Sequence, residues 1–276
     1  MNTRLNNLSK FTIYAFLILI GIFSIFPFLW MITTSLKNTH SLYTFPPEFI
    51  PKSPTFDNYF RLFKETPFVL WFKNSLIITI VAIVYNLFFS SLAGYILAKM
   101  NFKGKNFIFL LILGTTMIPY NVLLVPVFVI FSHIKLINTF PGIIIPGLAN
   151  AFIIFVMRQY ILTIPNALID AAKMDGASEI TIFIKIILPL CTPALAINAV
   201  FAFLWTWNSF IWPLILAPNN EYYTLQVGLA LFQSYNNIPW GTVMAGATLS
   251  FLPQLILYLF LQRYFVSGIT MSGLKG

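Results

Sequence analysis

The stretch from Asn166 to Pro189, NALIDAAKMDGASEITIFIKIILP, decides how the rest of the chain is interpreted. It lies between two long apolar runs, and it holds three of the protein's seven acidic residues. Pro165 precedes a run of helix formers and Gly176 follows it, an arrangement typical of a helix's first turn and of the position just past its end. The sequence therefore predicts a short helix over 166–175, outside the lipid.

The composition of this short helix favours a docking role. Ala171 and Ala172 lie at its middle, where small side chains let another surface approach closely. Asp170 and Asp175 add carboxylates near them, in a protein with few acidic residues. We interpret the segment as a docking element between membrane spans, and a merely structural loop is the alternative.

The same residues carry a family resemblance. The pattern Asp170-Ala171-Ala172, three residues, Gly176, nine residues, Ile186, one residue, Leu188-Pro189 resembles the EAA loop of permease subunits of ATP-binding-cassette importers. A pattern with four parts at fixed spacing is specific. Its one departure is Asp170, where the family has Glu, which keeps the carboxylate but shortens its reach. The resemblance implies that the loop is a coupling helix that docks on a cytoplasmic ATPase, with these coupling residues: Asp170, Ala171, Ala172, Asp175, Gly176, Ile186, Leu188 and Pro189. It also makes coupling depend on local packing at Gly176.

Composition places the whole chain in a membrane. Of 276 residues, 59% are hydrophobic and only 8% are charged, against about 25% charged in an ordinary soluble domain. The formal charge of +9 comes from basic residues scattered between apolar runs, which argues against a nucleic-acid partner. Cys191 is the single cysteine, so the chain has no internal disulfide.

Six apolar runs are long enough to span a bilayer, which takes about 20 helical residues. None has an Asp, Glu, Lys or Arg in its central part, and the first is too long for a cleaved signal. The predicted fold class is all-α: one polytopic membrane domain over 1–276, with six transmembrane helices and a cytoplasmic coupling helix between helices 4 and 5. The predicted spans are 11–34, 71–98, 107–131, 140–158, 183–216 and 240–261.

Lysine and arginine positions predict the orientation. The short connection 99–105 holds three lysines, whereas 217–239 holds no basic residue. Short cytoplasmic loops carry the excess of positive charge. Both termini and the 166–179 loop are therefore expected in the cytoplasm. Together with the resemblance, this predicts a multi-pass protein of the prokaryotic plasma (inner) membrane.

The long outer loop, 37–70, is rich in proline and then reads FDNYFRLF. The segment 57–63 is expected to form a short interfacial helix that presents Phe56, Tyr59, Phe60 and Phe63. Contact with an extracellular binding protein and an aromatic belt at the headgroup level both account for these rings.

The segment Ala202–Leu216, AFLWTWNSFIWPLIL, holds the candidate translocation path. An aromatic face and an amide suit stacking and hydrogen bonding to a sugar, so Trp207 and Asn208 are the candidates, whereas Trp205 and Trp212 are interpreted as anchoring or packing residues. The pattern W-N-x-F-x-x-P-L, the MIP at 117–119 and the tail from Gln262 resemble carbohydrate-importing permeases of the maltose type. That resemblance implies a sugar or oligosaccharide as the solute.

Several kinds of chemistry have no motif in this sequence. It contains no GxxxxGK[ST], HExxH, GxSxG or CxxC, so we predict no catalytic residues, no metal site and no cofactor bound by this chain. The resemblance implies ATP and Mg on partner ATPase subunits, a second, non-identical permease subunit and an extracellular solute-binding protein, with membrane lipid around them. The alternatives are an importer of another small solute, an uncoupled channel or facilitator, and a membrane enzyme or scaffold.

Overall fold

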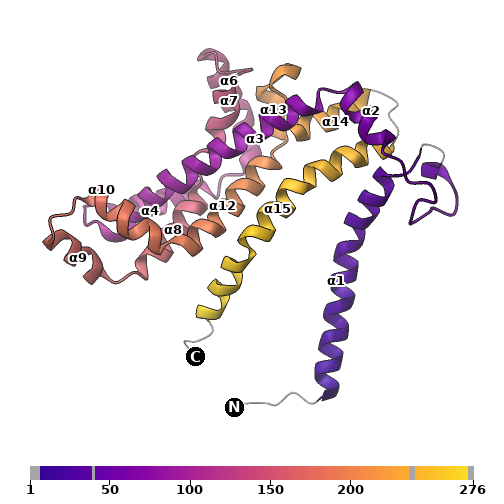
Figure 1. Ribbon diagram of the computed structural model, residues 1–276. Coiled ribbons are helices and arrows are strands. Elements are labelled where there is room, and N and C mark those ends of the chain that lie inside the picture. Colours follow the sequence, from indigo (N-terminus) through magenta and orange to yellow (C-terminus); the bar gives the residue numbers. More distant parts are fainter. Residues whose placement is uncertain (1–6, 39–40, 236–239, 273–276) are drawn as a thin grey trace. The chain divides into compact units, whose positions relative to one another are not determined.

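The computed structural model of the chain describes residues 7–38, 41–235 and 240–272, and within those ranges it contains helices and no strand (Figure 1). The all-α prediction is confirmed. The longer helices are α1 (Asn7–Ser35), α2 (Asp57–Glu65), α3 (Phe68–Tyr85), α4 (Ser91–Lys99), α5 (Lys105–Thr115), α6 (Leu124–His133), α8 (Ala151–Leu162), α9 (Asn166–Met174), α12 (Thr192–Trp207), α14 (Leu225–Tyr235) and α15 (Trp240–Ser272). The shorter ones are α7 (Phe140–Ile144), α10 (Glu179–Ile182), α11 (Leu188–Leu190), α13 (Ile211–Leu216), and the 3-10 or π segments η1 (Ser41–Tyr43), η2 (Asn86–Ser90), η3 (Tyr120–Leu123), η4 (Ile145–Gly147), η5 (Phe183–Ile187) and η6 (Asn220–Tyr222).

Three unbroken helices are long and apolar enough to cross a membrane: Lys10–Ser35, Phe68–Lys99 and Trp240–Arg263. Three further segments pass the same test only as bent pairs. They are Lys105–Thr115 with Tyr120–His133, Phe140–Gly147 with Ala151–Leu162, and Glu179–Leu190 with Thr192–Trp207, bent by 89°, 45° and 83°. Counting each pair as one span gives six, in the order and at the places of the six predicted spans.

Prolines and caps account for the breaks. Pro119 is the N-cap of η3, and Pro193 opens α12 directly after the break at Cys191. Proline lacks the N–H that would continue a helix, and it is tolerated in a membrane helix where other groups satisfy the freed backbone. The Asn150 side chain caps α8 by accepting from the N–H groups of Phe152 and Ile153. The predicted span 183–216 differs in extent, because α12 ends at Trp207 and α13 is a separate helix.

Contacts group the chain into two compact units, Met1–Phe68 with Leu229–Leu252, and Val69–Gly228 with Pro253–Gly276. The prediction of one domain over 1–276 stays a prediction.

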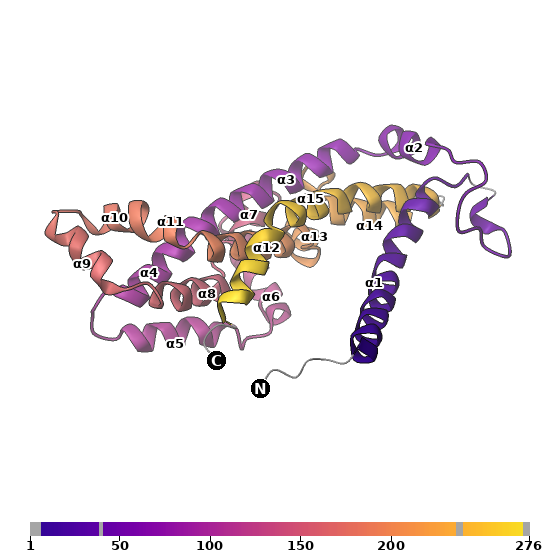
Figure 2. The ribbon, with the colours of Figure 1, turned by 60° about the horizontal axis from the view of Figure 1, so that its bottom comes forward.

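The larger unit is built on α4 and α8, which lie side by side, with α5 also against α8 (Figures 1 and 2). A Cβ on Gly94 would lie only 2.9 Å from the Cβ of Met157, so the two backbones approach as closely as glycine allows. The core around this contact includes Tyr95, Ile153, Met157, Ile161, Ile169, Ile182, Phe183 and Ile187. Helices α9 and α10 lie at one end of this unit (Figures 1 and 2).

The smaller unit is organised by α2, the helix expected in the outer loop. The buried Asn58 side chain donates to the carbonyl oxygens of Ser35 (2.9 Å), the last residue of α1, and of Lys37 (2.7 Å), two residues further on. Phe56, Phe60 and Phe63 are exposed, as the pattern predicts, whereas Tyr59 is half-buried and its hydroxyl hydrogen bonds with that of Ser35 (2.8 Å). Both interpretations of these rings stay open.

Candidate functional site

Helix α9 has the bounds that the sequence predicts, give or take one residue. Pro165 is its N-cap, and Gly176 follows its C-cap with a φ of +79°. The N–H of Gly176 donates to the Lys173 carbonyl (3.0 Å), and the N–H of Ala177 donates to that of Ala172 (2.9 Å). This pair of bonds is the Schellman motif, which needs a left-handed residue at the glycine position.

Helix α9 presents small and acidic side chains on its outer surface. Asp170, Ala171 and Asp175 are exposed, and Met174 is 88% exposed. On the opposite side Ile169 and Ala172 are buried against the core of the larger unit. The two central alanines therefore differ. Ala171 faces outward, whereas the small side chain of Ala172 lets α9 pack closely against the core of the larger unit.

Two side chains outside α9, Glu179 of α10 and Lys99 of α4, hold this helix in place. Glu179 accepts a hydrogen bond from the Tyr95 hydroxyl through Oε2 (2.7 Å) and pairs with Lys173 Nζ through Oε1 (2.6 Å). Lys99 Nζ donates to the Ile164 carbonyl (2.6 Å) and to the Asn166 side chain (2.8 Å). The two ends of α9 are thus both tied to α4.

The sequence does not predict that Tyr95 and Lys99 bond to residues of this loop. Tyr95 stands inside an apolar run and Lys99 at its end, where a lysine is already explained by membrane orientation. The contacts join residues 84 and 67 positions apart. Only the fold brings them together.

The second half of the predicted coupling motif continues into the fifth apolar segment. Ile186 lies in the π-helical η5, and Leu188 and Pro189 lie in α11, just before the bend at Cys191. Ile186 and Leu188 are half-buried against the core cluster, and Pro189 is exposed. These residues therefore connect α9 and α10 to the bend, and α9 carries the exposed acidic surface.

The structure places the two candidate path residues differently. Trp207 is 1% exposed and packs between Phe72 (5.6 Å between ring centroids) and Phe203 (5.3 Å), and it is not among the residues that line the cavity described next. Asn208 lines that cavity, and its side chain donates to the Leu204 carbonyl (3.0 Å). Adjacent helical residues point about 100° apart, so one can be core while the next faces an opening.

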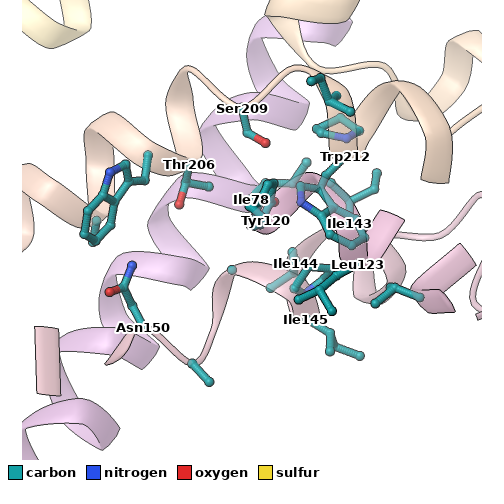
Figure 3. Close-up of a pocket in the computed structure, with 18 of the residues that line it drawn as sticks. Ile78, Tyr120, Leu123, Ile143, Ile144, Ile145, Asn150, Thr206, Ser209 and Trp212 are labelled. Carbon is teal, nitrogen blue, oxygen red and sulfur yellow. The ribbon is translucent and has the colours of Figure 1, made fainter. Parts of the chain in front are cut away.

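The cavity has a volume of about 970 Å³ and lies within the larger unit. It is lined by residues from α3, from the three bent segments and from α13. Figure 3 shows Asn150 and Thr206 on one side, and Tyr120, Trp212 and Ile143–Ile145 on the other. The sequence did not single out Tyr120, Asn150 or Thr206, because none of them belongs to a recognisable motif.

Among the residues that the structure describes, no group of His, Cys, Asp or Glu is arranged to hold a metal ion. The tail from Gln262, part of the resemblance, has no described side chain beyond Arg263. Its contacts therefore fall outside the described residues.

Comparison with known proteins gives consistent results. The model of the family described as "Binding-protein-dependent transport system inner membrane component" matches residues 90–271, well over half of the chain. An arabinooligosaccharides transport system permease protein, AraQ of Halalkalibacterium halodurans, is 40% identical over 93% of both chains. A lactose transport system permease protein, LacG of Rhizobium radiobacter, is 35% identical over 99% of both.

Structural similarity extends over nearly the whole length. A chain of a bacterial ABC transporter involved in the import of the acidic polysaccharide alginate superposes with a TM-score of 0.83 at 25% identity, covering 96% of this chain and 99% of that one. The matched family range takes in the α9 loop, all three bent segments and most of α15. On these grounds the chain belongs to the family of binding-protein-dependent transport system inner membrane components, and it is a multi-pass membrane protein.

Proposed function

We propose that this chain is a transmembrane permease subunit of an ATP-driven importer, for a sugar or oligosaccharide delivered by an extracellular binding protein. The observation that carries the proposal is α9, a short helix with an exposed Asp170, Ala171 and Asp175, fixed at both ends to the membrane helix α4. Relatives that span nearly the whole chain transport arabinooligosaccharides and lactose, which supports a carbohydrate.

Energy for transport enters from outside the chain in this proposal. ATP and Mg are bound by partner ATPase subunits, and α9 docks on them from the cytoplasmic side, where both termini also lie. A second, non-identical permease subunit completes the path. Closure of the ATPases on ATP moves α9, and the movement passes through Glu179 and η5 to the bend at Cys191, so that access alternates between the two sides.

The contacts of α9 support this route. An isolated helix of nine residues is marginal by itself, so α9 transmits force only if it is fixed to the rest of the subunit. Glu179 and Lys99 provide that attachment, through Tyr95, Lys173 and Asn166. An uncoupled channel would not explain why α9 is both exposed and firmly attached to the rest of the subunit.

The test is uptake of radiolabelled arabinooligosaccharide, lactose, maltose and trehalose in three strains: the parent, one lacking this chain and one lacking the partner ATPase. We expect uptake of at least one sugar in the parent and its loss in both deletion strains. Uptake that persists without the ATPase would establish a facilitator instead. Purification of the tagged chain should recover the ATPase, and its absence from a transport-competent preparation would contradict the proposal.

A further inference from the structure

The lining of the 970 Å³ cavity combines polar groups with a complete lack of charge. Every described residue that lines it is uncharged, in a protein whose basic residues outnumber its acidic ones by 16 to 7. The amides and hydroxyls of the lining are Ser75, Asn86, Thr115, Thr116, Tyr120, Asn121, Asn150, Thr206, Asn208, Ser209 and Thr224. A cavity of this size is at the upper end of those that hold a small organic ligand, about 300–1,000 Å³.

Two of the lining residues have buried polar atoms without a partner. Trp212 is 3% exposed and Thr224 is 4% exposed, and neither the indole Nε1 nor the threonine hydroxyl bonds to any described residue. Buried polar groups are nearly always paired, so an orphaned donor beside a cavity indicates a ligand or water that completes it. Asn86 is different, because its amide already donates to the carbonyl oxygens of Ala82 (2.9 Å) and Gly147 (3.0 Å).

Aromatic rings border the same space. Trp205 is 45% exposed and Tyr120 is 51% exposed, and the Tyr120 ring lies edge-on to Trp212 at 4.9 Å. A sugar ring has an apolar C–H face and a rim of hydroxyl groups. The face suits an aromatic side chain, and the rim suits the amides, the hydroxyls and the Trp212 N–H.

We propose that this cavity is a solute-binding site of the chain itself, that it takes an uncharged oligosaccharide, and that Trp212 and Thr224 hydrogen bond to the sugar hydroxyls. This inference takes from the proposed function that the solute is a carbohydrate. It adds that the carbohydrate is uncharged. An acidic sugar would bring a carboxylate into a lining that offers neutral donors but no cation, so its lost hydration would be replaced only in part and its charge would stay unpaired. This distinguishes the chain from the similar alginate transporter, which imports an acidic polysaccharide.

The first test is equilibrium binding to the purified full-length chain in detergent, with tritiated maltotriose and arabinotriose as neutral probes and tri-galacturonate as the acidic competitor. A neutral trisaccharide should bind, and the uronate should compete at least about tenfold more weakly. Trp212→Phe and Thr224→Val should each weaken neutral binding about three- to tenfold, the value of one hydrogen bond.

Trp71→Phe is the matched control. Trp71 is also buried, at 4% exposure, but its indole donates to Asn220 (2.8 Å) and it does not line the cavity. Its substitution should leave sugar binding unchanged. Absence of binding by both neutral probes, equal binding of the uronate, or an equal loss in Trp71→Phe would each overturn the proposal.

A second variant tests charge selection without removing a buried group. Ser209 lines the cavity and is only half-buried, so Ser209→Lys places a cation there, with Ser209→Met as the uncharged control of similar length. Only the lysine variant should gain uronate binding, about fivefold or more. No gain would overturn the assignment of selectivity to the uncharged lining.

These measurements separate the site from the transport proposal, because the isolated chain needs no ATPase to bind sugar. Binding by the chain without ATP-dependent uptake in cells would keep the site and remove the proposed function. ATP-dependent uptake with no binding by the chain would keep the proposed function and remove the site.

Discussion

At the scale of single residues, Gly176 decides how α9 ends. A Cβ at this position meets no atom within 4 Å, so space does not require glycine there. The backbone conformation requires glycine instead, because the φ of +79° is left-handed and costs other residues about 1–2 kcal/mol. The sequence predicts that coupling depends on packing at Gly176, but the structure shows open space and a positive φ there, so the need for glycine lies in the backbone conformation.

We therefore expect substitutions at Gly176 to rank by tolerance of positive φ. Gly176→Val should uncouple the importer and strongly lower sugar-stimulated ATP hydrolysis, because a β-branched residue disfavours this conformation most. Gly176→Asn should retain most of the stimulation, since asparagine adopts it readily. The measurement is ATP turnover of the purified complex with and without sugar. An asparagine variant as impaired as valine would contradict the backbone explanation.

Neighbouring residues also mark what the sequence could not predict. Composition and motif predict that the region 202–216 holds residues of the translocation path. They assign both Trp207 and Asn208 to it, because nothing in the sequence shows which of the two faces the opening. The structure gives Trp207 to the core and Asn208 to the cavity lining. Which of two adjacent helical residues faces an opening depends on the rotation of the helix about its axis, and an apolar run without a polar face leaves that rotation undetermined.

At the scale of elements, the C-terminal end of α9 is attached to α4 through Glu179, by two bonds of unequal value. The Tyr95 side chain is buried and its hydroxyl donates to a carboxylate, a bond worth about 1.5–3 kcal/mol. The Lys173–Glu179 pair is half-exposed, with side-chain exposures of 50% and 41%, and such pairs give about 0.2–1 kcal/mol. The tyrosine bond is therefore the stronger attachment.

Tyr95→Phe should accordingly lower both the melting temperature of the chain in detergent and sugar-stimulated ATP turnover of the complex. Lys173→Met should have a smaller effect on each. The lysine contribution should shrink as salt rises, because exposed pairs are screened, whereas that of the tyrosine should not. Equal effects of the two variants at low salt would show that the ranking is wrong.

The contact of α4 with α8 provides a second test at this scale. Helices in lipid associate through close packing rather than the hydrophobic effect, so a glycine at the crossing matters. Gly94→Ala pushes a methyl group against Met157 and the backbone N of Arg158, at 2.9 and 3.0 Å, and should destabilise the chain by about 1–3 kcal/mol. Gly114→Ala, with no atom within 4 Å, is the control and should leave thermal stability in detergent unchanged or slightly higher. Equal stability of the two variants would exclude a tight crossing at Gly94.

Helices and their order were largely predictable, and the bends were not. Hydropathy located all six apolar segments, and Pro165 with Gly176 bounded α9. Proline is present both in bent segments and in the unbroken α1 and α15, at Pro27 and Pro253, so proline alone does not identify a break. A bend of 83° near Cys191 depends on which neighbouring groups satisfy the freed carbonyls, and that is a property of the packed structure.

At the scale of the whole molecule, transport by this route requires α9 to face the cytoplasm. The prediction of that orientation depends on the lysines of 99–105 and on their absence from 217–239. The chain offers a direct test because its only cysteine, Cys191, is buried and should not react with a maleimide. A single added cysteine therefore reports its own position.

Met174→Cys and Lys52→Cys suit this measurement, since Met174 is 88% exposed on α9 and the Lys52 side chain is 86% exposed in the predicted outer loop. A membrane-impermeant maleimide added to intact spheroplasts should label the cysteine at 52 and spare the one at 174. After permeabilisation both should react, and the parent chain with Cys191 alone should stay unlabelled throughout. Labelling at 174 in intact spheroplasts would place α9 outside, beyond the reach of any cytoplasmic ATPase. Within the described ranges, no other helix between the predicted spans is exposed and combines small with acidic residues. That outcome would therefore leave the chain without a docking helix for the ATPase.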